Sequence, residues 1–181
     1  LVLGKHSGRN ALSKKIEDLG YTLTDSELKE VFEDFKILAD EKKVLFEEDI
    51  LSLIQKQKFS EEDLITYKLE SLKCSFESGK IPKASVVLTN RDGEKNEATA
   101  NGDGPVDSIC NAIDSIIGLP CKLIDYQVMS KTKGRDAQGE VTVRVVSDNR
   151  EVLGKGVGVN TIEASGFAYI NAINKLLFKA K

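Results

Sequence analysis

The residues best suited to binding chemistry lie in the stretch 100–117, which reads ANGDGPVDSICNAIDSII. Gly102 and Gly104 bracket Asp103, and Pro105 then precedes apolar residues at helical spacing. Proline suits the first turn of a helix, where its missing N–H is not needed, and glycine lets another molecule approach the backbone. The free N–H groups at a helix N-terminus attract carboxylates and phosphates. The stretch therefore predicts an anion-binding turn, or else a plain connection from a strand to a helix.

Metal and thiol chemistry find little support in the sequence. His6 is the only histidine, which excludes a site with several histidines, and we interpret it as a packing or hydrogen-bonding residue. Cys74, Cys110 and Cys121 form no CxxC pair, and Cys110 falls on the apolar face of the predicted helix, where we expect a core residue. An odd and sparse cysteine count is typical of a reducing intracellular compartment, so we expect a cytoplasmic protein.

Composition excludes two classes of partner. The 181 residues are 40% hydrophobic, enough for a core, and carry a formal net charge of −3 without a basic stripe, which argues against nucleic acid. The turn GRDAQG at 134–139 has four residues between its glycines and so fits an RNA-binding GxxG loop poorly. No apolar run approaches the roughly 18–20 residues that span a membrane.

The chain begins without methionine or a signal pattern, as expected of the C-terminal piece of a longer protein.

The first third of the chain predicts a small all-helical unit over residues 1–58. Residues 1–10 are expected to form a loop, and three amphipathic helices follow. The second helix should begin at Thr24, because Thr24 and Glu27 have the spacing of a capping box. Residues 59–64 are interpreted as a linker to the rest of the chain.

The remainder predicts an internal repeat of three strands and one helix. The units cover about 65–118 and 121–179, and residues 64–74 alone fit a helix or a strand equally well. In this alignment the glycine turn 102–104 corresponds to a second one at 156–158, each just before its helix. The fold class expected is therefore α+β: a helical subdomain followed by two pseudo-symmetric βββα units.

Several motifs together carry a resemblance to a known family. They are LGKHSGRNAL, GDGPVDSICNAI, LIDYQV, GRDAQGEVTVRV and EASGFAYINAINKL. The combination resembles the C-terminal part of 2-isopropylmalate synthase, with citramalate synthase as the close relative. The resemblance implies a helical subdomain and a regulatory domain that forms a homodimer and binds the end-product amino acid as a feedback inhibitor. The N-terminal catalytic barrel, to which the divalent metal and acetyl-CoA belong, is not in this sequence, so we expect no cofactor and no synthase activity here.

The resemblance also implies an effector site between the two βββα units at the dimer interface. Helix N–H groups would hold the carboxylate of the amino acid, and backbone carbonyls or an aspartate would hold its ammonium group. The residues that match are Gly102, Asp103, Gly104, Asp107, Leu123, Tyr126, Ser130 and Ala137. The second glycine turn at 156–158 would close the site.

Small residues at Ser130 and Ala137 suit leucine as the effector, whereas a bulky residue in place of Ser130 would point to isoleucine. A degenerate site, in a chain that serves only as a dimerisation scaffold, is the alternative. On pattern alone Tyr126 could equally be an ordinary buried tyrosine. An independent enzyme is disfavoured, because a single histidine offers no nucleophile–base pair or metal cluster.

Overall fold

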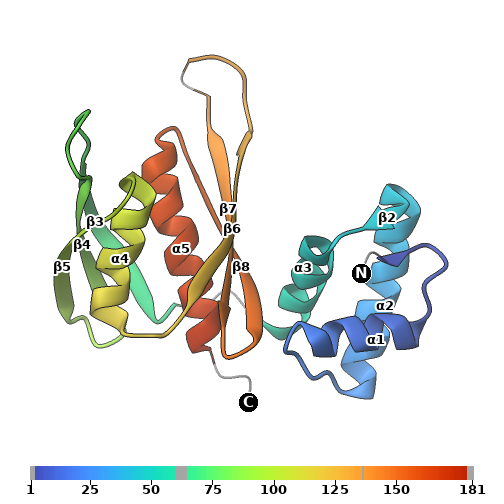
Figure 1. Cartoon of the computed structure of the whole chain (residues 1–181). Helices are drawn as coiled ribbons and strands as arrows, with labels where there is room; N and C mark the ends of the chain where they lie inside the picture. The colour runs from blue at the N-terminus through green and yellow to red at the C-terminus, as the bar shows by residue number, and fades with distance from the viewer. Residues whose placement is uncertain (1–2, 60–64, 136, 179–181) are drawn as a thin grey trace.

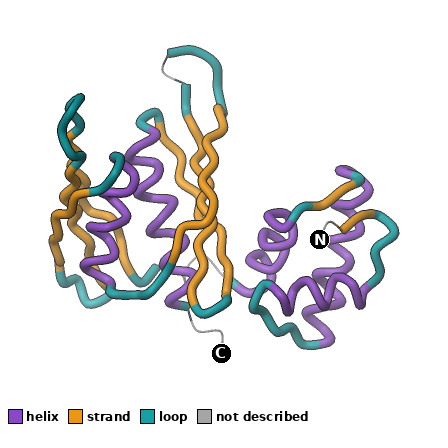
Figure 2. Tube along the Cα trace, in the orientation of Figure 1, coloured by secondary structure: helices purple, strands orange, loops and turns teal. Residues whose placement is uncertain are grey.

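The computed structural model describes residues 3–59, 65–135 and 137–178 (Figure 1). Helices gather at the N-terminal end, and two three-stranded sheets with two further helices form the rest (Figure 2). This arrangement confirms the predicted α+β class. Residues 60–64 of the predicted linker and Asp136 of the predicted turn lie outside the described residues, and the predicted division at 58–65 stays a prediction.

The N-terminal part contains three helices and one very short antiparallel ladder. The elements are β1 (Leu3–Gly4), α1 (Arg9–Asp18), α2 (Asp25–Lys42), β2 (Val44–Leu45) and α3 (Glu47–Lys58). The predicted N-terminal helices are confirmed, with one correction: Leu3–Gly4 is a short strand, where the sequence predicts a loop over residues 1–10. Leu3 and Leu45 pair in this ladder and are both buried. Two-residue strands are too short to produce a period in the sequence, and long-range pairing defines them.

The start of α2 follows the predicted capping chemistry. The Thr24 hydroxyl accepts the Glu27 N–H at 3.2 Å, and a Glu27 carboxylate oxygen accepts the Thr24 N–H at 2.7 Å. Along α2 the buried residues Val31, Phe35 and Ala39 recur every four positions, so one face of the helix packs into the core.

The first βββα unit is an antiparallel sheet covered by one helix. It comprises β3 (Tyr67–Ser75), β4 (Lys83–Asn90), β5 (Lys95–Asn101) and α4 (Pro105–Ile117), in the sheet order β3-β4-β5. Of the segment 64–74, which fits a helix or a strand equally well by pattern, residues 67–74 are thus a strand, and Leu64 lies outside the described residues. Its alternation was obscured because β3 carries a β-bulge between Leu69 and Ser71, which interrupts the period of two.

The second unit repeats the first. It comprises β6 (Lys122–Ser130), β7 (Gly139–Ser147), β8 (Arg150–Gly158) and α5 (Thr161–Leu177), in the order β6-β7-β8. Its first strand also carries a bulge, between Leu123 and Asp125. Helices α4 and α5 contact each other and lie between the two sheets (Figure 1). The predicted repeat is confirmed, and the core lies where each helix meets its sheet.

The expected second glycine turn is wrong. Gly156 and Gly158 belong to β8, and α5 begins shortly after the strand, with Asn160 as its N-cap. The position that Gly104 occupies before α4 is therefore taken by Asn160 before α5. A pattern of alternating glycines fits a turn and a strand equally well. Here the segment is a strand, because it packs against α5.

The glycines of β8 allow α5 to lie directly on the strand. A Cβ atom on Gly154 would come within 2.0 Å of the Ala168 carbonyl oxygen, and one on Gly156 within 2.1 Å of the Ala164 carbonyl oxygen. No side chain fits at either position. Helix–strand packing explains Gly154 and Gly156, whereas the expectation that residues 156–158 close an effector site stays a prediction.

Candidate functional site

The two glycines of the turn before α4 have different structural roles. A Cβ on Gly102 would lie 2.3 Å from the Ser108 amide nitrogen and 2.8 Å from a carboxylate oxygen of Asp107, so no larger residue fits there. Gly104 has an extended backbone with φ −148°, and a Cβ added to it would meet no atom within 4 Å. Local structure therefore explains Gly102, whereas the surface above Gly104 is open to another molecule.

The N-terminus of α4 has no side-chain cap. Gly104 is the N-cap residue and has no side chain to accept a hydrogen bond, and Pro105 follows it. The Asp107 carboxylate accepts the Asp103 N–H at 2.8 Å, which holds the turn in shape. Asp103 itself is exposed. The first amide groups of α4 thus combine with the positive end of the helix dipole at an open surface, a setting that favours an anion.

Helix α5 begins differently. The Asn160 side-chain oxygen accepts the N–H groups of Ile162 at 3.0 Å and Glu163 at 3.2 Å. These bonds satisfy the orphan donors that α4 leaves free. The two pseudo-equivalent helix starts are therefore unequal, and only the one at Gly104 is open.

The strand residues of the predicted site lie on one face of β6. Leu123 pairs with Val145 and Tyr126 pairs with Val143, and both partners are buried. Residues three apart on a regular strand point to opposite faces. The bulge at Ile124 inserts one extra residue between Leu123 and Asp125, so the alternation shifts by one position. Leu123 and Tyr126 therefore point to the same face of the second sheet, the one that faces α5.

Tyr126 is anchored at its far end rather than buried. Its hydroxyl lies 2.8 Å from the Ser165 hydroxyl of α5, yet 37% of the residue is exposed. Val128, the next residue on the same face, is 51% exposed. Ser130 ends the strand opposite Gly139, and Ala137 lies in the hairpin loop between β6 and β7. The interpretation of Tyr126 as an ordinary buried tyrosine does not hold for the single chain.

The first strands of the two sheets differ in what covers them. Leu69 and Leu72 of β3 lie against Gly166 of α5, where an added Cβ would be 2.9 Å from Leu72 Cδ1. Leu123 and Tyr126 hold the corresponding places on β6, but within the described residues neither α4 nor α5 packs broadly on that strand. The pseudo-symmetry is therefore broken, and an apolar strip on β6 is left open.

Within one chain the predicted site residues fall into two groups. Gly102, Asp103 and Asp107 line an open depression of about 580 Å³ together with residues of the β3–β4 loop. No residue of β6 lines it. The structure therefore does not bring the glycine turn and the Tyr126 face together in a single cavity of the described chain.

Most of the chain matches a known protein family. The family described as "LeuA allosteric (dimerisation) domain" matches residues 44–177. The chain belongs to this family. A second family, "Homocitrate synthase post-HMGL domain-like", matches residues 1–43. The LeuA region therefore begins at β2 and includes α3 as well as both βββα units.

Curated relatives agree with this assignment. The chain is 44% identical to a 2-isopropylmalate synthase of Pelotomaculum thermopropionicum, over all of this chain and 35% of that protein. It is 45% identical to one of Carboxydothermus hydrogenoformans, over 98% of this chain and 35% of the relative. The resemblance to the C-terminal part of 2-isopropylmalate synthase is thus confirmed. The chain spans about a third of the length of these relatives.

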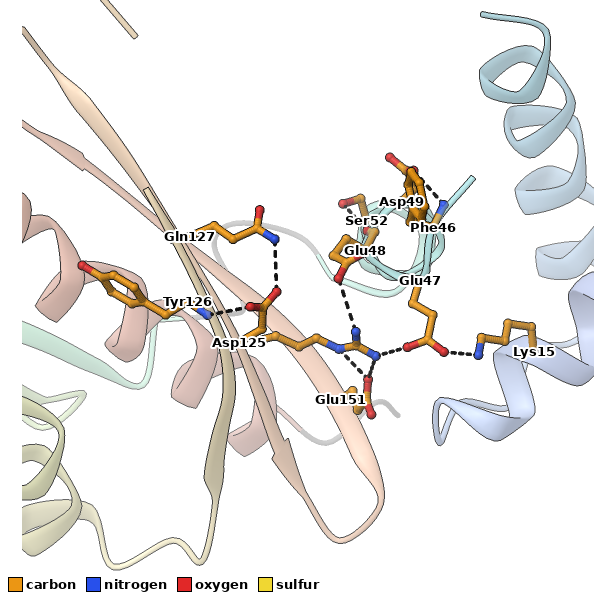
Figure 3. Close-up of polar contacts among 11 residues, drawn as sticks. Lys15, Phe46, Glu47, Glu48, Asp49, Ser52, Asp125, Tyr126, Gln127 and Glu151 are labelled. Atoms are coloured by element: carbon orange, nitrogen blue, oxygen red, sulfur yellow. Dashed lines mark hydrogen bonds and ion pairs between the residues drawn. The ribbon is translucent and has the colours of Figure 1, made fainter. Parts of the chain in front are cut away.

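A charge network joins the LeuA region to the helices before it. Arg144 of β7 donates from Nε to Glu151 at 2.7 Å and from Nη1 to Glu48 at 3.4 Å, and its Nη2 contacts Glu47 and Glu151. Lys15 of α1 contacts the other side of Glu47 (Figure 3). The network thus runs from α1 through the start of α3 to the outer face of the second sheet.

The network is partly shielded from water. The Arg144 side chain is 12% exposed and that of Lys15 is 10% exposed. Hydrogen bonds from Lys15 and then from Arg144 lower the pKa of Glu47 to about 2. Sequence reasoning missed this network, because its residues come from four elements, α1, α3, β7 and β8, and no local motif marks them.

A buried polar contact also links the two helices of the LeuA region. The Tyr169 hydroxyl of α5 donates to the Asp114 carboxylate of α4 at 2.6 Å, and the Cys121 sulfur lies 3.2 Å from the same hydroxyl. Burial raises the pKa of Asp114, and burial likewise raises the pKa of Tyr169. Cys110 is buried, as predicted, and burial raises the pKa of its thiol to about 12.

The described part of the chain offers no group of three or more histidine, cysteine or carboxylate side chains that could hold a metal ion. His6 lies near the Lys5–Asp40 ion pair, whose charged atoms are 3.0 Å apart. Among the helices that the structure describes, none is long and apolar enough to cross a membrane.

Proposed function

We propose that this chain is the regulatory part of a 2-isopropylmalate synthase, that it forms a homodimer and that it binds leucine as a feedback inhibitor. The family assignment supplies the allosteric and dimerisation roles, and the relatives supply the identity of the parent enzyme. Leucine as the effector is our inference from the residues of the site.

The observation that carries the proposal is the open helix start at Gly104. The N-terminus of α4 has no side-chain cap, whereas Asn160 caps the equivalent start of α5. A bound α-carboxylate would satisfy the free amide groups of α4 and gain from the helix dipole. The exposed Asp103 carboxylate lies beside this turn and is available for the ammonium group of the same ligand.

The open face of β6 supplies a surface for an aliphatic side chain. Leu123, Tyr126 and Val128 share that face, and no helix of the described chain covers it broadly. We propose that a second copy covers it and that the Gly104 turn and the Tyr126 face meet across the dimer. Ser130 and Ala137, both small, leave room for the branch of leucine. A single methyl placement changes affinity by about 1–3 kcal/mol, so leucine should bind roughly tenfold or more tightly than isoleucine.

Calorimetric titration of the 181-residue chain with leucine and with isoleucine tests the proposal, together with sedimentation to establish the dimer. Gly104→Ala should weaken leucine binding at least about tenfold, because the added methyl occupies the surface above the open amides. Gly8→Ala is the matched control, since Gly8 is the N-cap of α1 and has no atom within 4 Å of a Cβ position. Equal leucine affinity in both variants would refute the role of Gly104.

Two alternatives have distinct outcomes in the same titration. Stronger binding of isoleucine would identify an isoleucine-regulated relative such as citramalate synthase. A folded dimer that binds neither amino acid would identify a dimerisation scaffold. The separation of the two groups of site residues within one chain is the observation that favours the scaffold.

The signal to the rest of the enzyme would pass through α3. We propose that leucine stiffens the dimer and that the Arg144–Glu47–Lys15 contacts transmit this to α1. Hydrogen exchange of residues 9–58 with and without leucine, in the full-length enzyme, would measure this, and unchanged protection would refute the route. The metal and acetyl-CoA of the synthase reaction are expected on the barrel, and the chain alone should show no turnover in a synthase assay.

A further inference from the structure

The segment between β5 and α4 is folded against the first turn of the helix. The Gly102 N–H donates to the Pro82 carbonyl at 3.2 Å. A Cβ on Gly102 would lie 2.3 Å from the Ser108 amide nitrogen, so the chain passes directly over the start of α4. The shape of residues 101–104 therefore decides which surface surrounds the first amide groups of this helix.

Helix geometry identifies the amide groups that can receive an anion. The first N–H groups of an α-helix have no acceptor within the helix. Pro105 has no N–H, and the Ser108 N–H donates to the Gly104 carbonyl at 3.0 Å. The donors of the first turn are therefore the N–H groups of Val106 and Asp107. Two adjacent donors suit the two oxygens of one carboxylate.

Two side chains of α4 hold the segment at both ends. The Asp107 carboxylate accepts the Asp103 N–H at 2.8 Å through its Oδ2 atom. One helical turn further along, the Asn111 side-chain nitrogen donates to the Asn101 carbonyl at 2.9 Å and lies 3.5 Å from the same Oδ2 atom. Residues four apart on a helix share a face, so both side chains act on the segment from one side.

The hydrogen bond and the charge of Asp107 have opposite effects on anion binding. The Oδ2 atom would lie 2.8 Å from a Cβ on Gly102, so this oxygen is directed at the backbone of the turn. The negative charge lies in the first turn of α4, where it repels an incoming carboxylate. A direct contact with the ammonium group of an amino acid would instead make use of that charge.

We propose that Asp107 and Asn111 are positioning residues of the effector site. Their side chains hold residues 101–104 against α4 and so preset the N–H groups of Val106 and Asp107 for a carboxylate. A segment that is fixed before binding lowers the entropy cost of binding. The inference rests on the proposed function. It gives the Asp107 carboxylate the role of supporting the turn instead of contacting the ligand, and it adds Asn111, which sequence reasoning did not single out.

Titration of the 181-residue chain with leucine separates the two effects of the Asp107 carboxylate. Asp107→Ala removes both the hydrogen bond and the charge, and it should weaken leucine binding at least roughly tenfold, about 1.4 kcal/mol. Asp107→Asn removes only the charge, because its side-chain oxygen can still accept the Asp103 N–H. This conservative variant should restore the affinity to within about threefold of the native chain.

Hydrogen exchange of the Asp103 amide, measured without ligand, reports on the turn itself. The amide should exchange faster in Asp107→Ala than in the native chain, and Asp107→Asn should restore its protection. Asn111→Ala should weaken leucine binding at least about threefold, and it keeps the test valid if Asp107→Ala fails to fold. Asn96→Ala, at an exposed asparagine of β5, is the control and should leave the affinity unchanged.

The titration distinguishes failure of this inference from failure of the proposed function. A loss of affinity in Asp107→Asn as large as in Asp107→Ala would refute the positioning role, because the charge would then contact the ligand. Native affinity in both Asp107→Ala and Asn111→Ala would refute it as well. Both outcomes leave the proposed function standing, whereas a native chain that binds no leucine would refute the two together.

Discussion

The hydroxyl oxygen of Tyr126 on β6 lies 2.8 Å from that of Ser165 on α5. The Ser165 hydroxyl also lies 2.6 Å from the Thr161 carbonyl, which can only accept, so Ser165 donates there and Tyr126 donates to Ser165. The bond ties an exposed ring to a buried helix residue. Tyr126 is thus positioned before any ligand or second copy arrives, which lowers the entropy cost of binding against it.

Tyr126→Phe should therefore lower the free energy of unfolding by about 0.5–1 kcal/mol, because the loss is that of one partly exposed hydrogen bond. Urea denaturation measures the change. Tyr67→Phe is the control, since no hydrogen bond of the Tyr67 hydroxyl is found among the described residues. A loss in the control as large as in Tyr126→Phe would show that the bond to Ser165 contributes nothing.

Gly154→Ala should be strongly destabilising, by about 3 kcal/mol or more, because the new methyl would lie 2.0 Å from the Ala168 carbonyl oxygen and force α5 away from β8. Gly104→Ala makes the same chemical change at an open position and should cost less than about 1 kcal/mol. Thermal and urea unfolding compare the two variants. Similar losses would contradict the close packing of α5 on β8.

Arg144→Met should lower the free energy of unfolding by about 1–3 kcal/mol, because it leaves Glu47, Glu48 and Glu151 without their shared cation. Lys131→Met, at the residue that follows β6, is the matched control. Lys131 pairs with Glu140 at 3.2 Å and its side chain is 48% exposed, so its loss should cost less than about 1 kcal/mol. An Arg144 variant as stable as the control would contradict a stabilising network.

Acid should weaken the contact between α3 and its neighbours. The pKa of Glu47 is about 2 in the folded chain against the usual 4.5, so the unfolded state takes up the proton first as the pH falls. The stabilisation is complete above pH 4.5 and is lost progressively between 4.5 and 2. Urea midpoints across this range should fall less steeply in Glu47→Gln than in the exposed control Glu33→Gln. Parallel pH profiles would contradict the assignment.

Alkaline pH should remove the free-energy cost of burying the charged form of Lys175, because the ammonium group loses its proton. Its pKa is about 8 in the folded chain against 10.5 ordinarily, so between these values the unfolded state binds more protons and stability rises with pH. Tyrosine and cysteine ionisation in the unfolded state acts in the opposite direction, and Lys175→Met isolates the lysine effect. The stability of the native chain relative to Lys175→Met should therefore increase above about pH 8. A constant difference would contradict a buried, charged Lys175.

Local patterns were sufficient for most elements of the fold. The capping box at Thr24, the proline start of α4 and the alternating valines of β7 all form where predicted. These signals depend on residues within a few positions of one another, so the sequence contains them in full. The exceptions are the two-residue strands β1 and β2, which pair across about 40 residues, and β3, whose bulge interrupts the alternation.

The same distinction separates the two glycine patterns. Both Gly102–Gly104 and Gly156–Gly158 have the composition of flexible turns, but only the tertiary structure shows that the second pair belongs to β8, where Gly156 packs against the Ala164 carbonyl oxygen. The two glycines of the turn before α4 likewise differ. Gly102 is required because the backbone of α4 lies too close for a Cβ, whereas a Cβ on Gly104 would meet no atom within 4 Å.

The sequence by itself determined the α+β class, the repeat and the position of a helix start that can receive an anion, because periodicity, capping and glycine content are local properties. Only the tertiary structure decided which helix start is open and that a bulge places Leu123 and Tyr126 on one face. It also brought Arg144 into ion pairs with carboxylates of α3 and β8. The Arg144 contacts join residues that are far apart in the chain, and the bulge depends on how β6 pairs with β7, so no spacing along the chain predicts them. The two helix starts differ in a local contact, but only the folded repeat shows that they are equivalent positions.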